Sequence, residues 1–302
     1  MRLRSYAGLQ DLYAMLDLLS EGYQANNGTY YIHRGDLQWW LFYSETPLQL
    51  WQSRIRLWMD GERLIGWALL APEDDSFDVY VIPELRGSAD EYEMLVAAMN
   101  ELSYLDELNN TWVADADDIR IQWFEINGFK LADEPFVHFT RSLSGPVPDP
   151  QLPAGFSLRT SHGDEADARL RAVASHAAFK SGVPFEKYWL RTLRFVQSPV
   201  YVKEHEIFVI APNGEVAAYC IIWTDEQAKL GHFEPVGTHP DYQRKGLGKS
   251  LLFEGLRRLN SEGMMMADVC TNHDNAAAIH LYESVGFRID KRLLTYKKKR
   301  TL

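Results

Sequence analysis

The stretch YQRKGLGKSLL (242–252) contains the residue types that bind a phosphate group. Gln-x-x-Gly-x-Gly at 243–248 follows a predicted strand and opens a predicted helix. Glycines let the backbone approach a ligand closely, and free N–H groups at a helix N-terminus bind pyrophosphate with the help of the helix dipole. Arg244, Lys245 and Lys249 add positive charge beside this turn. The spacing therefore predicts an anion site.

The two commonest nucleotide-binding loops do not fit this turn. A P-loop needs a glycine where Gln243 stands, and a dinucleotide-binding loop needs a third glycine where Leu251 stands. The sequence also has no Gly-x-Ser-x-Gly and no His-Glu-x-x-His motif, because His205–Glu206 lacks the second histidine. We therefore expect no nucleotide triphosphatase and no metal site.

The segments FEPVGTHPDYQRKGLGKSLL (233–252) and NHDNAAAIHLYESVGF (272–287) extend this pattern. Their strand, turn, long helix and later Asn-to-Tyr helix resemble the GNAT superfamily of acyl-CoA-dependent N-acyltransferases in order and spacing. The resemblance implies that the anion is the pyrophosphate of acetyl-CoA, the co-substrate. It also implies that the strand before the turn separates from its parallel neighbour (264–270) to admit the pantetheine arm. Pro235 fits this place, because a proline inside a strand marks an edge or a bulge.

The same resemblance implies which residues bind the co-substrate. Backbone N–H groups of the turn would hold the pyrophosphate, and that of Val236, or one beside it, would bond the thioester carbonyl. The residues expected to bind acetyl-CoA are Val236, Gly237, Thr238, Gln243, Arg244, Lys245, Gly246, Leu247, Gly248, Lys249, Ser250 and Asn275.

Three side chains are candidates for moving protons in such a transfer. An amine nucleophile must lose a proton, and a departing thiolate is helped by gaining one. Alternation along the predicted strand places His232 and Glu234 on one face. In the family a carboxylate on this strand often serves as general base, so Glu234 is the first candidate and His232 the second. By resemblance Tyr282 is the acid, and Asn275, two helical turns earlier, is expected on the same helix face.

The chain has two halves with the same plan. A proline-rich segment, SLSGPVPDPQLPAGF (142–156), has the composition of a semi-rigid linker. On its two sides IQWFEINGF (121–129) matches IHLYESVGF (279–287), with Ile, Glu, Gly and Phe in register. We expect an α/β (α+β) fold of two tandem GNAT-like domains, each a mixed, mostly antiparallel sheet flanked by helices. The expected limits are 1–145 for a degenerate domain, 146–155 for the linker and 156–302 for the catalytic domain.

Local patterns predict the elements of the second half. The expected strands are Phe156–Thr160, 206–211, 215–224, 229–237, Met264–Cys270 and 287–299. The expected helices are Asp164–Phe179, Pro184–Phe195, Gly246–Ser261 and Ala276–Ser284.

The first half lacks the residues that make the second a binding site. Aligned by Pro83 with Pro240, its counterparts are Ala89 for Gly246, Glu91 for Gly248 and Phe124 for Tyr282. The carboxylates of Asp90, Glu91 and Glu93 would repel a pyrophosphate, although Arg86–Gly87 could serve a shifted loop. We expect this half to shape the acceptor pocket or to stabilise the fold. In architecture the pair resembles tandem two-domain members of the GNAT superfamily, whose substrates are not carried over.

The net charge of −11 is unevenly distributed. Residues 1–150 carry 10 Lys and Arg against 25 Asp and Glu, whereas residues 151–302 carry 21 against 17. The acidic first half would favour a cationic amine by electrostatic steering, unless it is simply a well-solvated surface.

The sequence favours an acetyl-CoA-dependent N-acetyltransferase that acts on a primary amine of a small molecule by direct attack in a ternary complex. Two alternatives stay open: transfer of another acyl group or to a non-amine acceptor, and a catalytically silent acyl-CoA-binding sensor or interaction module. The longest apolar run, Val216–Trp223, is far shorter than the roughly 20 residues that span a bilayer, and KKKR (297–300) is interpreted as a strand end. We expect a cytoplasmic monomer or homodimer with no nucleic-acid or membrane partner.

Overall fold

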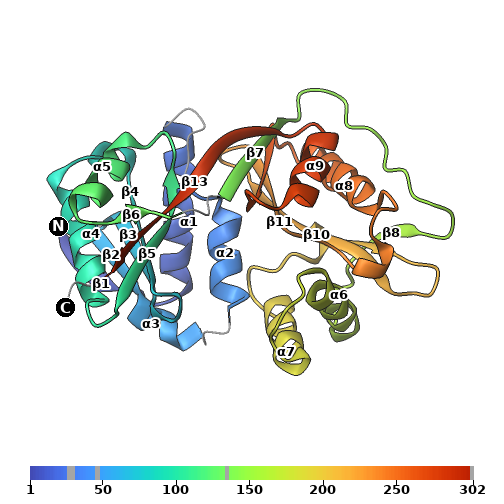
Figure 1. Ribbon diagram of the computed structural model, residues 1–302, viewed down its shortest axis with the longest axis horizontal. Helices are drawn as coiled ribbons and strands as arrows, with labels where there is room; N and C mark the ends of the chain where they lie inside the picture. Colours follow the sequence, from blue (N-terminus) through green and yellow to red (C-terminus); the bar gives the residue numbers. More distant parts are fainter. Residues whose placement is uncertain (26–30, 45–47, 133–135, 300–302) are drawn as a thin grey trace.

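The protein is built on one mixed, mostly antiparallel sheet flanked by helices (Figure 1). The computed structural model describes residues 1–25, 31–44, 48–132 and 136–299. The first half contains β1 (Arg2–Ser5), α1 (Leu9–Ala25), α2 (Arg34–Phe42), α3 (Trp51–Arg54), β2 (Ile55–Asp60), β3 (Arg63–Ala71), β4 (Ser76–Val81), α4 (Ala89–Glu101), β5 (Glu107–Ala114), α5 (Asp118–Ile126), β6 (Lys130–Leu131) and β7 (Phe136–Ser142).

The second half repeats this order after the linker. It contains β8 (Ser157–Thr160), α6 (Glu165–Ala178), α7 (Phe185–Val196), β9 (Glu206–Ile210), β10 (Val216–Asp225), β11 (Leu230–Thr238), α8 (Leu247–Ser261), β12 (Met266–Asn272), α9 (Ala276–Ser284) and β13 (Arg288–Lys299). These confirm the elements predicted for the second half, each displaced by no more than a few residues. Of the basic run at 297–300, the first three residues end β13 and residue 300 lies outside the described residues.

The last strands of the two halves are exchanged. Within the described residues the strand order is β1-β2-β3-β4-β5-β13-β7-β12-β11-β10-β9-β8, and β6 pairs beside this path with β13. β7, which precedes the linker, therefore completes the sheet of the second half, and β13 completes that of the first (Figure 1). The linker divides the chain into two halves but does not divide the sheet. The sequence could not predict this exchange, because apolar alternation predicts a strand without specifying its neighbour. The division into domains 1–145 and 156–302 stays a prediction.

Helix α8 covers one face of the second half's sheet. Its apolar side chains Leu247, Leu251, Leu252, Leu256 and Leu259 are at most 1% exposed, as the helical spacing of this segment requires. At Gly255 a Cβ would lie 2.4 Å from the ring of Phe233 on β11, so glycine permits the helix to approach the sheet closely. At the start of α8, a Cβ at Gly248 would lie 3.6 Å from Oγ1 of Thr238, so the helix start lies against the end of β11, at the candidate anion site.

The opposite face of the same sheet is covered partly by the first half. Helix α2 packs on β10 and β11, and Trp223 of β10 belongs to the same hydrophobic core as the interior of the first half. A Cβ at Gly35 of α2 would lie 2.5 Å from Cγ of Trp223. The two halves therefore share one core, and glycine sets the distance between them at this point.

Among the described residues, no helix combines the length and the apolar composition that crossing a bilayer requires.

We predict that Gly35→Ala destabilises the protein by about 1–3 kcal/mol, because the added methyl overlaps the indole of Trp223. An alanine in an unstrained helix would otherwise stabilise slightly. The measurement is urea unfolding, with Gly182→Ala as the matched control, because a Cβ at Gly182 meets nothing within 4 Å. Equal midpoints for the two variants would show that α2 does not press on β10.

Candidate active site

The strands β11 and β12 separate where the candidate site begins. Their parallel pairing ends at Phe233, so Glu234–Thr238 continues β11 with no β12 partner in the described part of the chain. On the other side, Glu234 and Pro235 together lie opposite the single residue Ile221 of β10, which makes a bulge. The predicted separation is confirmed, and of the two features that Pro235 predicted, an edge or a bulge, the structure has the bulge. Backbone groups are thus left available beside Glu234.

Helix α8 begins just beyond this separation with unpaired backbone donors. The N–H of Ser250 makes the first helical bond, 3.1 Å from the carbonyl oxygen of Gly246. The N–H groups of Leu247, Gly248 and Lys249 precede it and have no partner within the helix. Gly246 has a φ of 78°, a left-handed conformation that glycine adopts without strain. These donors and the helix dipole suit a dianion.

The basic side chains of the turn are exposed around these donors. Arg244, Lys245 and Lys249 lie on the surface, and no buried carboxylate pairs with them in the described structure. Nζ of Lys245 lies 3.3 Å from the carbonyl oxygen of Asp241, which keeps this cation next to the turn. The residues present therefore fit a pyrophosphate.

Two residues predicted to bind the co-substrate are engaged elsewhere. The hydroxyl of Ser250 donates to the carbonyl of Gln151 in the linker, so this side chain faces away from the turn. Asn275 is the N-cap of α9: its Oδ1 accepts from the N–H of Ala278 at 3.2 Å, and its Nδ2 donates to Thr271. The expectation that Asn275 shares a helix face with Tyr282 is wrong, because Asn275 precedes the helix.

The remaining predicted binding residues lie along the end of β11 and the turn. Val236 is half-buried, and Gly237 passes so close to Tyr219 that a Cβ would lie 2.6 Å from its ring. The carbonyl of Thr238 accepts from Nε2 of Gln243 at 3.2 Å, so this glutamine braces the turn through its side chain. The predicted binding residues thus lie together in the structure, but some of them, such as Gly237 and Gln243, shape the turn and the strand before it.

Glu234 lies at the separation of the strands in a setting that perturbs its proton affinity. Burial and, second to it, the charge of Asp36 raise the pKa of Glu234 to about 7, although His232 opposes the rise. Its backbone carbonyl accepts from the indole nitrogen of Trp223 at 2.8 Å. A carboxyl group with a pKa near 7 can accept a proton at neutral pH and release it again.

His232 is held between two carboxylates behind Glu234. Its Nε2 lies 3.1 Å from Oδ1 of Asp36 on α2, and its Nδ1 lies 2.6 Å from Oδ1 of Asp268 on β12. The ring stacks on His33 at 4.9 Å between centroids. Burial would lower the pKa of His232, but the carboxylate of Asp36 outweighs it and raises this pKa above its usual value.

The sequence prediction missed Asp36 and Asp268. Asp268 had an available signal, because a carboxylate inside the apolar stretch MADVC must find a partner when the strand is buried. Asp36 gave none, since its contact with His232 joins residues 196 positions apart in different halves.

Tyr282 is buried in α9 beside the same site. It is 5% exposed and makes edge-to-face contacts with Phe139 and Phe287, at 5.7 and 6.1 Å between ring centroids. Burial raises the pKa of its hydroxyl, and the charge of Glu234 adds to the rise. The phenol therefore stays protonated at neutral pH and can act as a proton donor.

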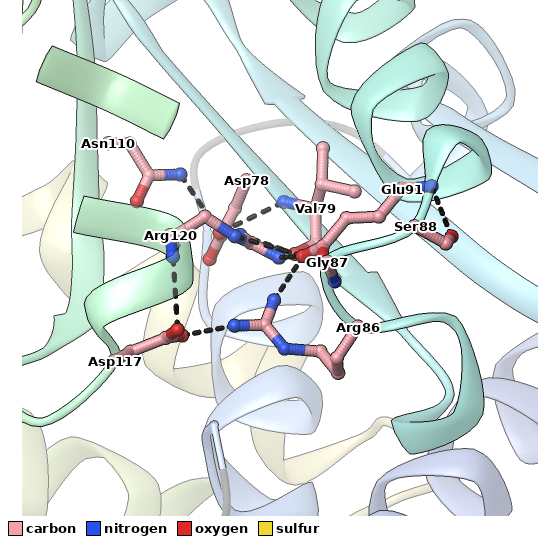
Figure 2. A network of polar contacts seen from close by, with 9 residues as sticks. All are labelled: Asp78, Val79, Arg86, Gly87, Ser88, Glu91, Asn110, Asp117 and Arg120. Carbon is pink, nitrogen blue, oxygen red and sulfur yellow. Dashed lines mark hydrogen bonds and ion pairs between the residues drawn. The ribbon is translucent and has the colours of Figure 1, made fainter. Parts of the chain in front are cut away.

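In the first half a side chain fills the equivalent of the anion site (Figure 2). The carboxylate of Glu91, which stands where Gly248 stands in the second half, is 1% exposed. It accepts from the N–H of Gly87 at 2.5 Å, from Arg86, and from Nη2 of Arg120 at 2.5 Å. Arg86 also pairs with Asp117, so the shifted loop that Arg86–Gly87 could have formed is already occupied from within.

Arg120 also blocks the strand edge of the first half. Its Nη1 donates to the carbonyl of Val79 at 3.0 Å, on the strand that corresponds to β11 (Figure 2). A ligand arm lying along β4 would meet this buried guanidinium. In the first half the position equivalent to the binding site is thus occupied by an internal carboxylate, that of Glu91, and an internal guanidinium, that of Arg120.

A cavity of about 920 Å³ lies where the halves meet. Its wall includes aromatic side chains of the first half, and it reaches the loop 272–274 between β12 and α9. Members of this wall are Trp39, Trp40, Tyr43, Trp51, Trp112, Asp74 and Asp78. No group of three or more metal-ligating side chains occurs among the described residues.

Comparisons with known proteins place these features in one family. The Acetyltransferase (GNAT) family matches residues 172–287. A mycothiol acetyltransferase of Streptomyces coelicolor is 27% identical over 289 residues, covering 94% of this chain and 90% of its own length. A mycothiol acetyltransferase of Streptomyces bingchenggensis is 30% identical over 243 residues, with 78% and 77% covered.

Solved structures show the same fold. A tandem GNAT protein from the clavulanic acid biosynthesis pathway aligns with a TM-score of 0.69 and 16% identity, covering 99% of this chain and 98% of its own. A GCN5-related N-acetyltransferase from Sphaerobacter thermophilus aligns with a TM-score of 0.67 and 17% identity, covering 99% and 95%.

We predict that Glu91→Gln lowers the free energy of unfolding by about 3–5 kcal/mol, because it leaves the buried guanidinium of Arg120 without a counter-charge. Glu93→Gln is the matched control, since Glu93 lies on the same helix and is exposed. Urea unfolding followed by tryptophan fluorescence measures the difference. If both variants unfold at the wild-type midpoint, the network of Figure 2 does not stabilise the first half.

Proposed function

Because the chain belongs to the GNAT acetyltransferase family, we propose that it moves an acetyl group from acetyl-CoA to a primary amine of a small molecule. Transfer would occur by direct attack of the amine in a ternary complex. Bound acetyl-CoA would supply the acetyl group as an activated thioester. The working site would lie in the second half.

Two neighbouring features carry the proposal: the separation of β11 from β12 and the unpaired N–H groups at the start of α8. β11 leaves β12 after Phe233, and the unpaired N–H groups of Leu247, Gly248 and Lys249 lie at the next helix start. The first offers backbone groups to an extended arm, and the second offers donors to a dianion. In the first half both positions are filled by Arg120 and Glu91, so we propose one co-substrate site per chain.

We propose Glu234 as the general base. It is the carboxylate at the separation of the strands, and its raised pKa suits proton uptake at neutral pH. His232 is 1% exposed, so we assign it to a place behind Glu234 rather than against the amine. Tyr282 would donate the proton that the departing thiolate takes up, because its hydroxyl is protonated and buried near Glu234.

The first half would form the acceptor side of the site. The cavity at the junction is lined by tryptophans, by Asp74 and Asp78 and by Lys297, and it reaches residues 272–274 at the end of β12. Carboxylates and aromatic faces both attract an ammonium group. The relatives are named mycothiol acetyltransferases, so their acceptor is the first amine to test.

We predict that the wild-type protein releases thiol from acetyl-CoA in the presence of at least one amine of a panel. Tyr282→Phe and Glu234→Gln should each lower kcat by about 10²–10⁴-fold, the usual contribution of a positioned proton-transfer group. Tyr104→Phe is the control, because Tyr104 is 64% exposed and distant in sequence from the site. Calorimetry should give one acetyl-CoA per chain.

Three results would overturn the proposal. Binding of acetyl-CoA without turnover of any amine would identify a sensor or interaction module. Preference for another acyl-CoA would change the transferred group. Failure to bind acetyl-CoA would exclude a transferase of this kind.

We predict that kcat/KM falls as the pH drops through about 7, because Glu234 must be ionised to accept a proton and its folded-state pKa is about 7. Above this pH the carboxylate is charged and the rate reaches a plateau. Glu234→Gln should remove this limb and leave a low, flat profile. A limb that persists in Glu234→Gln would assign the base to another group.

A further inference from the structure

Five ionisable side chains form a continuous chain of contacts across the centre of the sheet. Oδ1 of Asp36 lies 3.1 Å from Nε2 of His232, whose Nδ1 lies 2.6 Å from Oδ1 of Asp268. Oδ2 of Asp268 lies 3.1 Å from Nε2 of His138, whose Nδ1 lies 3.2 Å from Oδ2 of Asp290. Carboxylates and imidazoles alternate without a break. Each imidazole has a carboxylate oxygen within 3.2 Å of both of its nitrogens, and both oxygens of Asp268 face an imidazole.

The chain leads from the candidate active site to the surface. His232 lies next to Glu234 in sequence register on β11, and its side chain is 2% exposed. The side chains of Asp268 and His138 are 0% and 4% exposed, and that of Asp290 is 39% exposed. Exposure is lowest at the three middle residues; the side chain of Asp36 at the near end is 14% exposed, and Asp290 at the far end is the most exposed, so a proton passes most readily to water at Asp290.

The five residues come from five elements of both halves. Asp36 lies on α2, His232 on β11, Asp268 on β12, His138 on β7 and Asp290 on β13. The last two are the exchanged strands, so the path exists only because β7 and β13 lie side by side beyond β12. A structural ion pair needs only two side chains. Here five ionisable side chains follow one another, four of them on neighbouring strands, and they provide a path for a proton.

The proposed reaction must dispose of a proton in a buried place. An ammonium group, RNH₃⁺, and an acetyl thioester give an amide, RNH–CO–CH₃, a thiol and one free proton. The N–C bond forms and the C–S bond breaks. Of the three ammonium protons, one stays on the amide nitrogen, one reaches the thiol sulfur, and one must leave the site.

We propose that Asp36, His232, Asp268, His138 and Asp290 form a proton relay that carries this third proton from the active site to solvent. The inference rests on the proposed function, since only a reaction that releases a proton needs such a path. Asp36 makes the first half a contributor to the chemistry of the second.

The entry end of the relay is suited to receive a proton. The contact between Asp36 and Nε2 of His232 is close but not aligned as a hydrogen bond, and within the described residues Nε2 has no other acceptor. Asp36 and Glu234 are the carboxylates whose charges raise the pKa of His232 against its burial. His33, stacked on the ring, has a pKa lowered by its own burial, so it stays neutral and does not repel the charge.

The other groups have the protonation states that a relay requires. Burial raises the pKa of Asp268 well above its usual value, which favours the protonated carboxyl that a relay needs at this position. Burial lowers the pKa of His138 to about 4, so this imidazole is neutral and can accept at one nitrogen while it donates at the other. The hydrogen bond from His138, with Lys291 beside it, lowers the pKa of Asp290 to about 2, so a proton that arrives there is given up quickly to water.

Each transfer along the relay is balanced. A proton added at Nε2 of His232 displaces the one on Nδ1 to Oδ1 of Asp268. The proton on Oδ2 of Asp268 moves to Nε2 of His138, and that on Nδ1 of His138 moves to Asp290. Between turnovers both imidazoles exchange their protons and the carboxyl proton of Asp268 moves from Oδ1 back to Oδ2, which restores the starting state.

The test interrupts the relay at residues that are not reacting groups. Asp290→Asn removes the exit acceptor at an exposed position, and His138→Ala removes the central carrier. Glu262→Gln is the matched control, because Glu262 also pairs with a histidine, His205, at 2.9 Å and its side chain is also 39% exposed. Thiol release at saturating acetyl-CoA and amine is measured in weak buffer, in H₂O and D₂O, with and without added imidazole.

We expect His138→Ala to lower kcat by about 10²-fold, the lower end for a positioned proton carrier, and Asp290→Asn to lower it less. KM for acetyl-CoA should stay at the wild-type value. The solvent isotope effect on kcat should rise, because proton release becomes limiting. Imidazole should restore kcat of His138→Ala, since it can carry the proton through the vacated position, and it should leave Glu262→Gln unchanged.

Two outcomes would overturn the relay while the proposed function stands. The first is a wild-type kcat in both variants. The second is a loss of kcat that neither imidazole nor buffer concentration changes and that leaves the isotope effect unaltered, which would assign these residues to packing. If the wild-type protein turns over no amine, the proposed function fails and the relay fails with it.

Discussion

The pairing of β7 with β13 is the constraint on which the rest of the molecule depends. It joins two sets of strands into one sheet, and it does so by giving each half the last strand of the other. The interior of the first half can then continue into α6 and α7 of the second, and α2 can lie over β10 and β11. A contact such as that between Asp36 and His232 is held in place by this arrangement rather than by either half alone.

The two halves differ in how the free N–H groups at the start of α4 and of α8 meet a negative charge. Each has a strand, a turn and a helix start whose backbone donors need a negative charge. In the second half Gly246 and Gly248 leave that position open. In the first half Glu91 fills it with a carboxylate from the helix itself, and Arg86 and Arg120 neutralise it (Figure 2). Glu91 in place of Gly248, paired with Arg86 and Arg120, therefore makes an internal ion-pair network in the first half where the second half has an external anion site.

The sequence was informative wherever the signal was local. The glycine turn, the bulge at Pro235 and every helix of the second half followed from spacing, turn chemistry and periodicity. Motif spacing did not predict the internal partners of Ser250 and Asn275, which are a linker carbonyl and a helix N-terminus. The exchange of β7 and β13 could not be predicted, since apolar alternation is equally compatible with either neighbour. The partner of His232 on α2 could not be predicted either, because only the assembled sheet brings it there.

The position of β13 also bears on how the chain is made. β13 follows every other described strand in the sequence, yet it lies between β5 and β7, at the centre of the sheet. A ribosome that has delivered β1 to β12 has therefore delivered a sheet with its middle strand missing, and the edges of β5 and β7 stay unpaired until β13 emerges. Unpaired edges of this kind invite pairing with other chains. Pairing with β13 closes both edges at once.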